Sequence, residues 1–348
     1  MKLGVILLNF GEPERPVMDE VVPFLERIFT TNASLEGDVS PERVRSRSRE
    51  LAEKRAPGLI AEYTEIGGSP LNLQARSQAE SLAGVLRQRG HDAWAWVGYQ
   101  FTEPDIRTAA RSAVGTGISH LVGLPVYPLC GHSTTVAALR ELEVAVNELV
   151  GDVDYREISG WHAHDLYLRL RADGILAAAA MAGIDPNATN ARLVFAAHGT
   201  PVRYLREGNR YDRYVEECCS RIAEMAGVRD YVIGYQNHTN RPVEWTQPDL
   251  EDVMRNLDAE HALVVPVSFM HEQSETLAEL DHDVRRLAES RGIAFHRVPV
   301  PHDDPRFAEV LADLVEARLG VGAMELYRCV CRPSERTMCT NGSPHSQR

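Results

Sequence analysis

The sequence of 348 residues has little of three features that would point to a simple class of protein. It has six cysteines, which are few for a disulfide-stabilised secreted chain of this length. No apolar run approaches the roughly 20 residues that span a bilayer. Basic residues number 37 against 50 acidic ones, for a formal net charge of −13, whereas nucleic-acid binding needs a basic surface. We therefore expect no transmembrane segment and no nucleic-acid partner.

Motifs for binding nucleotides are also missing. The segment Ile66–Leu71 is a tight Gly-containing turn before a predicted helix, but it lacks the spacing and the lysine of a phosphate loop. No G-x-G-x-x-G motif follows the first predicted strand. Nucleotide binding is therefore weakly supported.

The N-terminal segment Lys2–Leu8 is apolar but shorter than a secretory signal, and no small-residue cleavage site follows it. It predicts a buried first strand and a cytoplasmic protein. In that compartment grouped cysteines favour metal binding over disulfides.

What the sequence does contain is a repeated alternation of strand and helix patterns. The predicted strands are Lys2–Leu8, Ala93–Gly98, His120–Val126, Val153–Ile158, Arg192–Ala197, Tyr231–Tyr235, Ala262–Val267 and Ala294–Val298. Predicted helices are Gln74–Arg89, Ser133–Leu149, Leu166–Ala182, Tyr211–Met225, Glu275–Glu289 and Asp304–Leu319. This alternation, with near-continuous apolar strands, is typical of α/β proteins with parallel sheets. We predict two domains built of βαβ units, residues 1–150 and 151–320, and a cysteine-containing tail, residues 321–348.

Ionisable residues directly follow two of the predicted strands, where parallel sheets hold their ligands. His198 leaves the fifth strand into the turn His198-Gly199-Thr200-Pro201. Its imidazole has an ordinary pKa near 6.5, so it can accept protons or bind metal near neutral pH. The alternative is a turn histidine held by the backbone.

Glu275, Glu279 and Asp283 follow the seventh strand at intervals of four residues. If Ser274 caps a helix there, the three carboxylates lie on one helix face. Such a ladder could carry divalent cations or protons into a cleft, with Glu275 across from His198. A solvated acidic helix face is the competing interpretation.

Six short motifs, taken in order, resemble those of ferrochelatases, which insert ferrous iron into a porphyrin in heme synthesis. The resemblance spans about residues 3–320. Its motifs are Leu8-Asn9-Phe10-Gly11-x-Pro13, Tyr63 with Ile66-Gly67-Gly68-Ser69-Pro70, Leu124-Pro125-x-Tyr127-Pro128 with Ser133-Thr134-Thr135, His198-Gly199-x-Pro201, Tyr235-Gln236 with Pro242-x-Glu244-Trp245, and Glu275-Thr276-Leu277-x-Glu279-Leu280-Asp281. Each motif alone is weak, but six in the family's order are specific.

The resemblance implies a class II chelatase fold, in which two Rossmann-like domains with parallel sheets enclose a porphyrin cleft between them. It implies that His198 is the proton acceptor or an iron ligand, that Glu275 faces it, and that Glu279 continues the acidic path as a further metal ligand. It also implies porphyrin contacts at the positions Phe10, Tyr127 and Trp245.

Two positions depart from the family's pattern. Members usually have a histidine two residues before the glutamate that corresponds to Glu275, whereas this chain has Gln273 there. The segment Tyr99-Gln100-Phe101 replaces the Arg-Tyr or similar pair that many members have after the second strand. Either change could alter substrate contacts or metal delivery.

Three cysteines lie close together in the tail: Cys329, Cys331 and Cys339. Some ferrochelatases bind a [2Fe-2S] cluster through three C-terminal cysteines and an internal one, and Cys130 lies in the corresponding internal segment, two residues before the usual position. The resemblance therefore implies a cluster on Cys130, Cys329, Cys331 and Cys339, since four thiolates suit it. Structural zinc and free thiols are the alternatives.

The main hypothesis is thus a ferrochelatase that acts on protoporphyrin IX or coproporphyrin III, as a monomer or a homodimer. One alternative is a related chelatase that loads cobalt or nickel into another tetrapyrrole. Another is a porphyrin or heme carrier without catalysis, which Gln273 keeps open.

Overall fold

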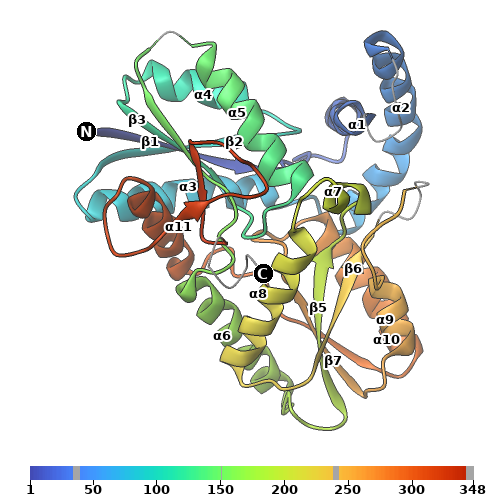
Figure 1. Ribbon diagram of the computed structural model, residues 1–348. Coiled ribbons are helices and arrows are strands. Elements are labelled where there is room, and N and C mark those ends of the chain that lie inside the picture. Colours follow the sequence, from blue (N-terminus) through green and yellow to red (C-terminus); the bar gives the residue numbers. More distant parts are fainter. Residues whose placement is uncertain (34–39, 150, 238–242, 342–348) are drawn as a thin grey trace.

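The computed structural model describes residues 1–33, 40–149, 151–237 and 243–341 (Figure 1). Residue 150 of the first predicted domain, Pro242 of the fifth motif and residues 342–348 of the predicted tail lie outside the described residues. All eight predicted strands are present. A six-stranded sheet has the order β2-β1-β3-β4-β10-β9, and a four-stranded sheet has the order β6-β5-β7-β8. The strands are β1 (Lys2–Asn9), β2 (Asp92–Tyr99), β3 (His120–Pro125), β4 (Asp154–Ile158), β5 (Ala191–His198), β6 (Tyr231–Gln236), β7 (His261–Pro266), β8 (Ala294–Arg297), β9 (Tyr327–Arg328) and β10 (Thr337–Cys339).

Helices flank both sheets, as the α/β prediction requires. They are α1 (Met18–Asn32), α2 (Pro41–Glu65), α3 (Leu71–Gln88), α4 (Ile106–Gly115), α5 (Ala137–Asn147), α6 (Asp165–Ala182), α7 (Val202–Arg206), α8 (Tyr211–Ala226), α9 (Leu250–Asn256), α10 (Arg285–Ser290) and α11 (Pro305–Arg318), with π-helices η2 (His132–Val136) and η3 (Glu275–Val284). Every pair of neighbouring strands is parallel except β9 and β10.

Several helices were not predicted, and most of them begin at a side-chain cap. Asp105 accepts a hydrogen bond from the backbone N–H of Thr108 at the start of α4, and Asp249 accepts one from Glu251 at the start of α9. Such caps satisfy N–H groups that have no partner within the helix. The helices α1 and α2 each contain an internal proline, which disfavours a helix prediction.

The strand pairing divides the chain differently from the predicted ranges. Strand β4, which we placed in the second domain, pairs in parallel with β3 of the first sheet. The predicted tail contributes β10, which pairs with β4. The first sheet thus takes strands from all three predicted segments, and the division at residue 150 stays a prediction about independent folding.

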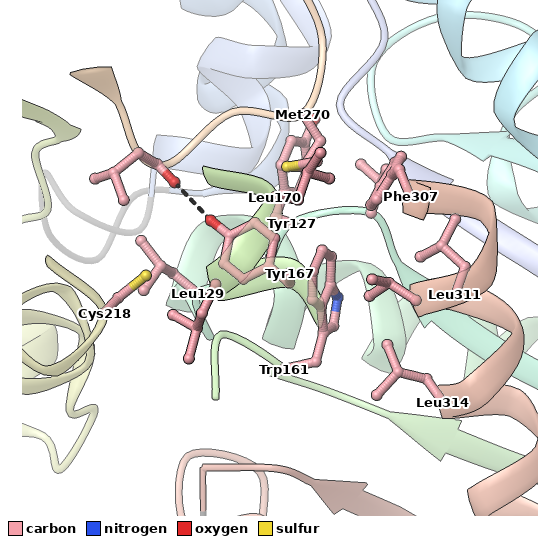
Figure 2. Packing of buried hydrophobic residues seen from close by; sticks show 14 of the residues in the cluster. Tyr127, Leu129, Trp161, Tyr167, Leu170, Cys218, Met270, Phe307, Leu311 and Leu314 are labelled. Atoms are coloured by element: carbon pink, nitrogen blue, oxygen red, sulfur yellow. Dashed lines mark hydrogen bonds between the residues drawn. The ribbon is translucent and has the colours of Figure 1, made fainter. Parts of the chain in front are cut away.

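One hydrophobic core joins the two sheets (Figure 2). Trp161, between them in the chain, is fully buried and packs with its ring against Tyr167 of α6 and Phe307 of α11, at centroid distances of 5.1 and 5.9 Å. Because an aromatic ring of this size buries a large apolar area, Trp161 stabilises the packing of α6 against α11. The helices α1 and α2 form a smaller core of their own with Phe101. The main core therefore includes residues of both sheets, whereas α1 and α2 pack in a separate cluster.

Candidate active site

A pocket lies where the carboxyl ends of β5, β6 and β7 meet the first sheet and the helix pair α1–α2. Its volume of about 350 Å³ lies in the range of pockets that bind small molecules, about 300–1,000 Å³. Six of the residues predicted from the sequence line it together: Phe10, Tyr127, His198, Trp245, Glu275 and Glu279. The fold thus brings these predicted residues together from segments far apart in the chain, while their chemical roles stay predictions.

Aromatic side chains form one wall of the pocket. The Phe10 ring packs on Phe101 at 4.5 Å between centroids, and the Phe10 backbone N–H donates to the Tyr127 hydroxyl at 2.9 Å. Trp245 is held near the turn after β5 by a bridge to Pro201. Flat apolar surfaces of this kind suit a large planar ligand.

His198 is the last residue of β5, and its position is fixed by the backbone. Its N–H donates to the Ser268 hydroxyl at 3.0 Å, and that hydroxyl is 2.9 Å from the Tyr211 hydroxyl. Gly199 must be glycine, because a Cβ there would collide with Asn237 and with the carbonyl of Gln236. Burial lowers the pKa of His198 to about 4, since desolvation disfavours the imidazolium. The imidazole is therefore neutral near pH 7.

Glu275 and Glu279 extend into the pocket from η3. The predicted ladder is correct for these two and wrong for Asp283, which is exposed and pairs with Arg286 at 3.6 Å. The segment is a π-helix with i→i+5 hydrogen bonds, so residues at intervals of four drift around the axis. Ser274 stands at the N-cap position but makes no capping bond.

Burial raises the pKa values of these two carboxyl groups, whereas it lowers the pKa of His198. Desolvation raises the pKa of Glu275, and desolvation together with the charge of Glu275 raises the pKa of Glu279 to about 8. Gln236 donates to Glu279 Oε2 at 2.9 Å. Among the residues that the structure describes, neither carboxyl group forms an ion pair, and the raised pKa keeps Glu279 protonated near pH 7.

Gln273, the departure from the family's pattern, lies in the pocket beside Glu275. Its amide nitrogen donates to Glu275 Oε2 at 2.9 Å. Its buried oxygen has no hydrogen-bond partner among the described residues. His271 does not replace the missing histidine, because it is fully buried and its Nε2 lies 2.7 Å from Gln78 Oε1 on α3.

Sequence reasoning missed Glu12, which the structure places behind Glu275. Glu12 is 2% exposed, and desolvation followed by the charge of Glu275 raises its pKa to about 7. Its position after the first strand was the available signal, since ligand sites follow strands in such sheets. Ser268, which was also missed, follows β7 in the same way.

The four cysteines predicted to act together do converge. Cys130, Cys329 and Cys339 all belong to the main hydrophobic core, and Cys331 packs against it. The neighbouring Cys130, Cys331 and Cys339 thiols, which stabilise its thiolate, lower the pKa of Cys329 well below its usual value. Within the described ranges, no three His, Cys, Asp or Glu side chains already form a metal-binding group, and all six cysteines are free thiols.

The tail that carries three of these cysteines is anchored by a buried ion pair. Arg332 contacts both carboxylate oxygens of fully buried Glu157, at 2.7 and 2.8 Å, and contacts Glu143 at 2.7 Å. Thr337 and Tyr155 donate to Glu157 as well. The position of the tail is thus fixed by ion pairs and hydrogen bonds within the chain.

Comparison with solved structures defines the class of fold. SirB from Bacillus subtilis, solved with Fe3+, matches over 92% of this chain and 98% of its own, with a TM-score of 0.56 and 13% identity. CbiX, the terminal enzyme of siroheme biosynthesis in denitrifying bacteria, matches over 91% and 99%, with a TM-score of 0.50 and 15% identity. The chain therefore has the fold of these chelatases. None of the helices in the described ranges has the length and apolar character to cross a bilayer.

Sequence comparison defines the family. The ferrochelatase family model matches residues 2–319. A ferrochelatase from a Synechococcus species is 33% identical over 343 residues, covering 96% of this chain and 87% of the relative. One from Nostoc punctiforme is 34% identical over 331 residues, covering 90% and 81%. The chain belongs to the ferrochelatase family, the lyases that insert iron into a porphyrin in heme biosynthesis.

Proposed function

We propose that the protein inserts Fe2+ into protoporphyrin IX or coproporphyrin III, with His198 as the proton acceptor and Glu275 and Glu279 as the groups that deliver the iron. The observation that carries this assignment is that one neutral imidazole and two carboxylates without ion pairs line the same aromatic pocket, within the part of the chain that the structure describes.

The chemistry requires both kinds of group. Insertion replaces two pyrrole N–H protons with one ferrous ion, so the products are the metalated porphyrin and two protons. A neutral imidazole can accept a proton as iron binds the nitrogens and acidifies the remaining N–H. Carboxylate oxygens bind ferrous iron weakly enough to release it to the nitrogens.

The aromatic wall would hold the porphyrin for this exchange. Phe10, Tyr127 and Trp245 offer flat surfaces on the same pocket. A pocket that holds the porphyrin ring distorted from planarity turns the nitrogen lone pairs toward the metal, and this lowers the barrier to metal insertion. The Tyr127 hydroxyl already accepts the Phe10 N–H, which sets the position of Phe10 without the substrate.

The test is anaerobic metalation of each porphyrin with Fe2+, followed by absorbance. His198→Ala should lower the turnover number by about 10²–10⁴, the usual contribution of a positioned base, while the dissociation constant for porphyrin is unchanged. His261→Ala, on the far end of β7, is the matched control. Wild-type protein that binds both porphyrins tightly but metalates neither would disprove the enzymatic function and favour a carrier.

We also propose a [2Fe-2S] cluster on Cys130, Cys329, Cys331 and Cys339. Four thiols that converge from the β3–η2 connection and the tail provide the donor set that such a cluster uses. Bound there, the cluster would supply a one-electron redox centre and a cross-link between the two segments.

Anaerobically purified protein should contain about two iron atoms and two sulfides per chain and absorb visible light. Cys329→Ser should lose this absorbance, whereas Cys218→Ser, a buried cysteine in α8, should keep it. Colourless protein with one zinc per chain would replace the cluster with a structural zinc site.

A further inference from the structure

Glu12 is a buried carboxylate that no part of the proposed function uses. It follows β1 by three residues and belongs to the first half of the chain, whereas Glu275 and Glu279 belong to the second. Its backbone is fixed by Asn72, which accepts from the Glu12 N–H at 3.1 Å and donates to the Glu12 carbonyl at 2.8 Å. Gly11 has a positive φ of 82°, which directs the next residue inward.

The Glu12 side chain is held by hydroxyl groups from three separate segments. The Ser274 hydroxyl donates to Glu12 Oε1 at 2.5 Å, and the Ser69 hydroxyl donates to Oε2. Tyr63 of α2 forms a third hydrogen bond. Among the described residues, Glu12 has no ion-pair partner, so these hydroxyls are what holds a buried carboxyl group in place.

Ser274 connects Glu12 with the pocket. It directly precedes Glu275, and its hydroxyl lies 3.1 Å from Glu275 Oε2 as well as 2.5 Å from Glu12. A serine at a helix start normally caps the helix, but this one makes no capping bond. Its hydroxyl is committed to the two carboxyl groups.

We propose that Glu12 is a positioning residue for iron insertion: through Ser274 it fixes the Glu275 carboxylate and thereby links the first half of the chain to the metal-delivering wall of the pocket. Gln273 donates to the same oxygen, Oε2, at 2.9 Å, so two neighbouring side chains hold that oxygen of Glu275. Misplacement of a reacting group by about 1 Å can lower rates by 10²-fold, so loss of this support should be measurable. This role rests on the proposed function.

Glu12→Ala is the first test. The kcat/KM for Fe2+ should fall about tenfold or more, with the porphyrin dissociation constant and circular dichroism unchanged. Glu12→Gln, which keeps an acceptor oxygen for Ser274, should restore part of the loss. The control is Glu14→Gln, an exposed residue paired with Arg76 at 2.6 Å, which should behave as wild type.

A double variant tests the route through Ser274. If Glu12 acts through that hydroxyl, Glu12→Ala combined with Ser274→Ala should be no slower than the slower single variant. Losses that multiply would overturn the route. Wild-type kcat/KM in Glu12→Ala, or Glu12→Gln as slow as Glu12→Ala, would overturn the positioning role. Wild-type protein without metalation activity would instead disprove the proposed function.

Discussion

Buried carboxylates occur in two regions of this protein, and their partners differ. In the tail, Glu157 is fully buried and pairs with Arg332. In the pocket, Glu275 and Glu279 are half-buried, and within the described part of the chain they have only amide and hydroxyl partners. A paired buried charge is satisfied by the protein, whereas an unpaired one shifts its pKa and keeps its capacity for a ligand. The presence or absence of a basic ion-pair partner therefore distinguishes a structural carboxylate from a functional one.

Breaking the structural pair should have the largest effect. Arg332→Ala leaves Glu157 buried without its cation, so the free energy of unfolding should fall by about 3–5 kcal/mol. Chemical denaturation measures this fall. Arg336→Ala, at a half-buried residue of the same tail 3.8 Å from Glu143, should cost less than about 0.5 kcal/mol. Equal losses from the two variants would contradict the distinction.

Removing a functional carboxylate should affect rate and leave stability intact. Glu275→Gln keeps the shape but removes the negative charge, so the kcat/KM for Fe2+ should fall about 10²–10³-fold. Steady-state metalation measures the loss. The free energy of unfolding should stay the same or rise, because a desolvated carboxylate is removed. A variant that is less stable but as active per folded molecule would refute this assignment.

The pH dependence of stability should be the smallest effect. Glu279 faces Glu275, Glu62, Asp283 and Gln236, and its pKa is raised from about 4.5 to about 8. The folded state then binds more protons than the unfolded state between these values, so stability falls as the pH rises through this window.

Glu279→Gln should make that fall shallower by about 1–2 kcal/mol, discounted for partial exposure. Thermal melts between pH 5 and 8 measure it. His198 contributes with the opposite sign, because its lowered pKa adds stability as the pH rises from about 4 to 6.5. Parallel melting curves for Glu279→Gln and wild type would count against the raised pKa.

Much of the fold and part of the site followed from the sequence. All eight predicted strands were correct because parallel strands buried on both faces have continuous apolar runs. His198 at the end of β5 and Glu275 in the segment after β7 were singled out because ligands bind at the carboxyl ends of parallel strands. Asp283 was misplaced because a π-helix has no distinct sequence period from which to predict it.

Other features depend on contacts between distant segments. Glu12 meets Ser274 across 262 positions in the sequence, and the sequence around either residue contains no sign of the other. The pairing of β10 with β4 was missed because a strand of three residues is too short to show alternation.

The pairing of β10 with β4 has a consequence for the order of folding. Strand β10 is synthesised about 180 residues after β4, and closing so long a loop is slow. Until then the β4 side of the first sheet is an open edge, which can pair with other chains. In the described part of the chain, β10 therefore covers the edge that β4 would otherwise expose, and a chain shortened before β10 should associate more readily than the full chain.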